Sequence, residues 1–99
     1  MKIAIFYKNN RLSYPTGEKI KISIFDIQNE IVNGVENMTI EPGTMDQLLV
    51  ALKEKNIDEV CVSEIDEESR NKLTAEGIKI KTADMLRNDK LFNSLHILS

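Results

Sequence analysis

Residues 44–62 read TMDQLLVALKEKNIDEVCV, and this stretch decides the fold. Apolar side chains recur at positions 45, 48, 49 and 52, the spacing of one helix face, and Thr44 stands three residues before Gln47, as in a capping box. The apolar run Val60-Cys61-Val62 follows this segment closely and is typical of a buried parallel strand. A helix that leads into a buried strand predicts an α/β fold.

The residues on either side supply the other elements. Before the helix, residues 2–7 predict a strand with both faces apolar, residues 11–18 a loop, and residues 20–27 and 31–40 a hairpin whose second strand is broken at Asn33-Gly34. After the buried strand, we expect a second helix capped by Asp66 and ended by Gly77, then a strand at residues 78–81. One helix or two short ones should follow from Asp84.

The expected order is therefore β-β-β-α-β-α-β-α, in a single domain that spans residues 1–99. Right-handed crossovers would place the strands of the second half beside the first strand, while the hairpin extends the opposite edge. This order predicts a three-layer α/β sandwich with a five-stranded mixed sheet.

Composition limits the partners and the compartment. The net charge is −3 and the sequence pI is about 5.1, which gives no electrostatic attraction for nucleic acid. The longest uninterrupted apolar run is too short to span a membrane, and the single cysteine forms no internal disulfide. We expect a cytoplasmic protein that binds neither nucleic acid nor a membrane.

The chain offers little for catalysis. His96 lies in an apolar segment, and a lone histidine does not build a metal site. Cys61 stands between two valines, as an inert core thiol would. The acidic cluster at positions 64, 66, 67 and 68 lacks EF-hand spacing and is interpreted as a helix start with solvated charge. The sequence predicts neither an enzyme nor a metal site.

Four segments resemble the dinitrogenase iron-molybdenum cofactor biosynthesis family, over about residues 1–87. These segments are KIAI at residues 2–5, ISIFD at 22–26, NIDEVCV at 56–62 and LTAEGIKI at 73–80. The resemblance implies a ribonuclease H-like fold and a protein that carries or donates the cofactor or its precursors without being an enzyme.

The sequence departs from that family where its members hold their ligand. Family members carry a histidine before the position of Gly17, a glycine-histidine-glycine segment before the first helix, and a glycine-rich turn after the fourth strand. Here these places read Tyr14-Pro15-Thr16, Glu41-Pro42-Gly43 and Ser63-Glu64-Ile65-Asp66. Iron clusters favour thiolate or imidazole ligands over carboxylates. We expect a member that keeps the fold while cluster binding is lost or altered.

Two functions stay open, and the cofactor is unknown. The first is a non-enzymatic, degenerate carrier of that family, whose binding residues would lie in three loops: Ser13, Gly17, Gly43, Thr44, Ser63 and Glu64. The second is a protein-interaction or regulatory domain without a metallocluster, which binds a protein partner or a second copy. The apolar residues 91–98 either pack back on the sheet, which we favour, or cover such a partner. A nuclease of the ribonuclease H type is disfavoured because residues 2–7 contain no carboxylate.

Overall fold

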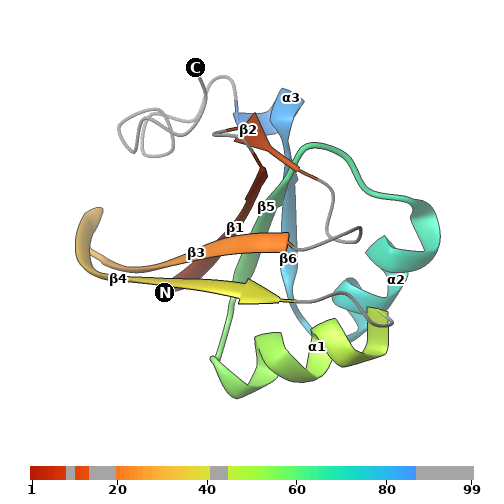
Figure 1. Ribbon diagram of the computed structural model, residues 1–99, viewed down its shortest axis with the longest axis horizontal. Coiled ribbons are helices and arrows are strands. Elements are labelled where there is room, and N and C mark those ends of the chain that lie inside the picture. Colours follow the sequence, from red (N-terminus) through yellow and green to blue (C-terminus); the bar gives the residue numbers. More distant parts are fainter. Residues whose placement is uncertain (9–10, 14–19, 41–44, 87–99) are drawn as a thin grey trace.

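The computed structural model of the chain describes residues 1–8, 11–13, 20–40 and 45–86. It is an α/β structure with a mixed sheet of five main strands and three helices (Figure 1). The elements, in chain order, are β1 (Lys2–Lys8), β2 (Arg11–Leu12), β3 (Ile20–Gln28), β4 (Ile31–Ile40), α1 (Met45–Glu54), β5 (Glu59–Val62), α2 (Glu67–Ala75), β6 (Lys79–Thr82) and α3 (Ala83–Leu86).

The strand order of the sheet is β4-β3-β1-β5-β6. The β3–β4 hairpin pairs antiparallel with β1, and β5 and β6 add to the other side of β1 as parallel strands. The prediction that the hairpin extends one edge and the second half of the chain extends the other is confirmed.

One face of the sheet packs against α1 and α2. Leu48, Leu49 and Leu52 of α1 and Leu73 of α2 share a buried cluster with Ala4, Phe6 and other alternate strand residues. Figure 1 shows both helices on the same side of the sheet. The apolar positions 45, 48, 49 and 52 form the buried face of α1, as their helical spacing predicted.

The other face of the sheet is apolar and buried as well. Ile3, Ile5, Phe25, Ile27 and Cys61 form a second cluster there. Both faces of β1 are buried, as its two apolar faces predicted. Two buried faces are consistent with a three-layer α/β fold, of which α1 and α2 form one outer layer.

Both helices end in the same way and lead straight into parallel strands. At the end of α1, Asn56 adopts φ +57°, and the N–H of Ile57 donates to the carbonyl oxygen of Leu52 at 3.1 Å. At the end of α2, Gly77 adopts φ +76°, and the N–H of Ile78 donates to the carbonyl oxygen of Leu73 at 3.0 Å. These are Schellman motifs, and they confirm Gly77 as the residue that ends the second helix.

Two local predictions were wrong. Residues 11 and 12 form β2, a two-residue strand that pairs with the end of β1, where a loop was expected. β4 runs through Asn33 and Gly34 without a break, because a register shift opposite Asp26 and Ile27 absorbs one extra residue as a bulge.

Other expectations fall at the limits of the described chain. The last helix begins at Ala83, and its predicted continuation beyond residue 86 lies outside the described residues, as does the Thr44 cap of α1. No described helix is long and apolar enough to cross a membrane.

Candidate functional site

The carboxyl ends of the parallel strands bring two of the predicted site residues together. The chain leaves β5 at Ser63, and the N–H of Ser63 donates to the carbonyl oxygen of Ser13 at 2.9 Å. The carbonyl oxygen of Ser63 accepts from the N–H of Ala83, which follows β6, at 3.3 Å. Ser13, Ser63 and Ala83 therefore lie side by side along one end of the sheet, as the parallel-strand topology predicts for the first two.

β2 occupies the position at which an open α/β sheet usually receives a ligand. Chain connections diverge between β1 and β5, and ligands of such sheets bind beyond the strand ends at that point. β3 lines the other side of β1 as far as Tyr7, so β2 pairs with Tyr7 and Lys8 on the side of β5. The N–H of Ser13 then donates to the carbonyl oxygen of Phe6 at 2.9 Å. The main chain of β2 and Ser13 therefore lies at this end of the sheet, between β1 and the end of β5.

The side chains at this end are oxygen donors. Ser13 and Ser63 are partly buried, and Glu64 is exposed. Hydroxyl and carboxylate oxygens suit hard cations and are poor ligands for an iron-sulfur or iron-molybdenum cluster. The described residues of the predicted site therefore do not fit the cluster that the family resemblance implies. The other three, Gly17, Gly43 and Thr44, lie outside the described residues.

The only cysteine points into the core. Cys61 is 1 % exposed and belongs to the apolar cluster on the second face of the sheet. This burial confirms the prediction of a core thiol. His96 lies outside the described residues.

The acidic residues after β5 build a helix start. Asp66 caps α2 by accepting from the N–H of Ser69 at 3.0 Å, and Glu67 and Glu68 lie in the positive first turn. Hydrogen bonds from the side chain and the backbone of Ser69 lower the pKa of Asp66 below its ordinary value of 3.8. Across the described ranges, no three His, Cys, Asp or Glu side chains gather as a metal site.

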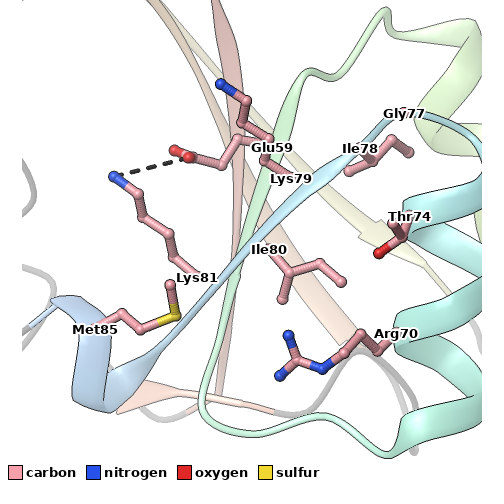
Figure 2. Close-up of a pocket in the computed structure, with 9 residues that line it drawn as sticks. All are labelled: Glu59, Arg70, Thr74, Gly77, Ile78, Lys79, Ile80, Lys81 and Met85. Carbon is pink, nitrogen blue, oxygen red and sulfur yellow. Dashed lines mark ion pairs between the residues drawn. The ribbon is translucent and has the colours of Figure 1, made fainter.

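A second place for a ligand lies along the outer edge of β6, which no described strand pairs. A hollow of about 470 Å³ there is lined by side chains from both faces of the strand. Figure 2 shows these side chains. On one face, Ile78 and Ile80 lie beside Arg70 and Thr74 of α2 (Figure 2). The other face is lined by Glu59, Lys79, Lys81 and, from α3, Met85.

Positive charge predominates in this hollow. Glu59, only 4 % exposed, lies 3.7 Å from the ammonium of Lys81, so these two charges compensate each other. Lys79 and Arg70 are both exposed, and neither makes an ion pair with another described residue. In a protein of net charge −3, two cations without a described acidic partner thus lie beside a strand edge that no described strand pairs.

Sequence reasoning missed this second place. Alternation of lysine and isoleucine at residues 78–81 was interpreted as a strand with a solvated face, which is correct for Lys79. The pattern does not show that Arg70, eight residues away, projects from α2 beside the same strand. A basic face on the last parallel strand of a sheet was the available signal, because that strand has to be an edge.

Comparisons with known proteins support the architecture. The crystal structure of PH0822 is similar to this chain with a TM-score of 0.71 and 18 % sequence identity, over 83 % of this chain and 76 % of PH0822. At that identity, the similarity shows the fold alone. No protein-family model matches the sequence, and no curated protein matches it.

Proposed function

We propose that this protein is a non-enzymatic binding module, descended from the dinitrogenase iron-molybdenum cofactor family, that has lost cluster binding and acts through contacts with another protein. The observation that carries the proposal is the hydrogen bond from the N–H of Ser63 to the carbonyl oxygen of Ser13. This bond holds Ser13, and β2 before it, at the strand ends where ligands of open α/β sheets usually bind.

The strand order supports the ribonuclease H-like assignment that the resemblance implies. A first strand flanked by an antiparallel hairpin on one side and by two parallel strands on the other is the arrangement expected from that likeness. β1 contains no carboxylate, which argues against nuclease chemistry on this framework, because two-metal hydrolysis needs acidic ligands.

Anaerobic reconstitution tests the loss of cluster binding. The full chain is incubated with ferrous iron, sulfide and a reductant, then separated from free metal by gel filtration. We expect the protein to elute without charge-transfer absorption in the visible range and with no bound iron. Retained absorption that is stoichiometric with folded protein would contradict the proposal.

A matched variant separates specific from adventitious iron. Cys61→Ala removes the single thiol, which contacts iron only if the core opens. Bands that appear in the wild-type chain and in Cys61→Ala alike would show a cluster held by other residues. Circular dichroism of each reconstituted sample shows that the chain is still folded when iron is measured.

The second candidate function is the cofactor carrier itself. The four resembling segments favour this lineage, whereas the oxygen donors at positions 13, 63 and 64 do not favour the cargo. The same reconstitution decides between the two candidates, because a carrier retains iron through gel filtration and a protein-binding module does not.

A further inference from the structure

The outer edge of β6 presents main-chain groups that no described strand pairs. The N–H of Lys79 donates to the carbonyl oxygen of Asp58 at 3.0 Å, so the main-chain groups of Lys79 face β5. Successive residues of a strand direct these groups to opposite sides. The N–H and C=O groups of Ile80 and the N–H of Thr82 therefore face outward, where β6 is the last described strand of the sheet, while the C=O of Thr82 is the first acceptor of α3.

The two faces beside this edge differ in chemistry. The side chains of Lys79 and Lys81 lie on one face, and that of Ile80 lies on the other, next to α2 (Figure 2). A strand added to the edge would alternate in the same way, with one set of side chains opposite the lysines and the other opposite Ile80.

We propose that the β6 edge binds an extended peptide in which acidic and apolar residues alternate, and that the peptide adds to the sheet as its next strand. The inference rests on the proposed function, because it names the kind of partner that the binding module recognises. Acidic side chains of the peptide pair with Lys79, and its apolar side chains pack on Ile80 beneath α2. Main-chain bonds to Ile80 and to the N–H of Thr82 supply affinity that is independent of sequence.

Charge selects this partner over a second copy of the chain. Two β6 edges that met in antiparallel register would bring Lys79 and Lys81 of one copy against those of the other, and like charges on neighbouring strands are destabilising. The same lysines attract an acidic strand.

The test uses the full chain, labelled with nitrogen-15, and a synthetic peptide, acetyl-Glu-Val-Glu-Val-Glu-Val-amide. We expect amide shifts centred on residues 79–82, with a Kd of about 0.1–1 mM, because a few main-chain bonds and exposed charge pairs contribute. Absence of shifts at about 2 mM peptide would overturn the proposal.

Two N-methylated versions of the peptide test strand addition. One is methylated on the glutamate amides and the other on the valine amides. Only one alternate set of amides faces β6 in an added strand, so one version should lose binding and the other should keep it. Equal binding by both versions would overturn the proposal, because it would show attraction between charges without a shared ladder.

Charge reversal on the protein tests the partner chemistry. Lys79→Glu should weaken binding roughly tenfold, whereas Lys21→Glu, at an exposed lysine of β3, should change it less than twofold. Equal loss from both changes would contradict a site at β6. Iron retention, the outcome that overturns the proposed function, is read in a separate experiment and leaves these binding results unaffected.

Discussion

Thiol labelling tests whether the one soft donor in the chain is sealed in the core. Cys61 is 1 % exposed and lies in β5, between β1 and β6, where it is in register with Ile5 on one side and Lys81 on the other. A reagent such as dithiobisnitrobenzoate reaches the sulfur only when these strands separate. We therefore expect native Cys61 to react much more slowly than an exposed thiol.

The size of the effect follows from the place of Cys61 in the sheet. Opening β5 disrupts pairing on both sides of the strand, so exposure of the thiol requires most of the global unfolding free energy. Folding constants of small domains are about 10³–10⁸, and labelling should be slowed by a factor in that range, or by at least about 10² if opening is partial. Urea should accelerate labelling with a slope close to the m-value for unfolding.

A matched thiol calibrates the measurement. Val50 is 57 % exposed on α1, so Val50→Cys in a Cys61→Ala background reports the rate for an accessible thiol on the folded protein. Both proteins are labelled at the same pH and reagent concentration, with absorbance as the readout. If native Cys61 reacts within tenfold of the rate of Val50→Cys, the thiol is accessible and the argument that soft donors are missing fails.

Three further predictions concern single positions. Glu30 adopts φ +63° in the two-residue turn between β3 and β4, so Glu30→Gly should raise the free energy of unfolding by about 0.5–1 kcal/mol in urea titrations, while the equally strained Glu30→Ala should give no gain. Leu73 is fully buried, and Leu73→Ala should lower the same free energy by about 3 kcal/mol. The pKa of Asp66 is lowered in the folded state by hydrogen bonds from Ser69, so its contribution to stability is present above pH 3.8 and is lost as the pH falls through the folded pKa. Asp66→Ala should reduce this acid dependence in urea titrations at several pH values, and an unchanged pH profile would contradict the cap.

Much of the fold follows from local pattern. The leucines of α1 repeat at the period of a helix, and the isoleucines of β3 alternate at the period of a strand, so the side chains that become buried are visible in the sequence. Gly77 marks the end of α2 because a left-handed residue is needed there, and Asn56 plays the same part after α1. Such signals extend over a few residues and depend little on contacts with residues far away in the sequence.

The two features that the sequence did not predict, β2 and the unbroken β4, depend on pairing with strands elsewhere in the sequence. β2 has two residues, too few for any period, and it forms because Tyr7 and Lys8 extend beyond the last pairing of β1 with β5. The continuity of β4 through Gly34 depends on a bulge opposite β3, and no local propensity specifies that register. Both features, the pairing of β2 and the bulge in β4, are set by the neighbouring strand in the sheet and not by local sequence.

The sequence predicts where the candidate site lies in the sheet, but it does not predict the hydrogen bonds made there. Parallel strands place the chain after β1 and the chain after β5 at the same end of a sheet, so Ser13 and Ser63 were expected to be neighbours. The direct hydrogen bond between their main chains depends on how β2 is aligned with β5, and no local sequence pattern specifies that alignment. Because of this bond, main chain lies where a ligand was expected.

The hydrogen bonding of the main chain therefore differs between the two candidate binding places, the carboxyl ends of the strands and the outer edge of β6. At the carboxyl ends of the strands, the N–H groups of Ser13, Ser63 and Ala83 already donate within the protein, so a ligand would have to displace existing bonds. Along β6, the N–H and C=O of Ile80 and the N–H of Thr82 meet no described strand, so an added strand would gain these bonds without displacing any between described strands. If the proposed function is correct, the β6 edge is the binding surface, and Lys79 favours an acidic strand there over a basic one.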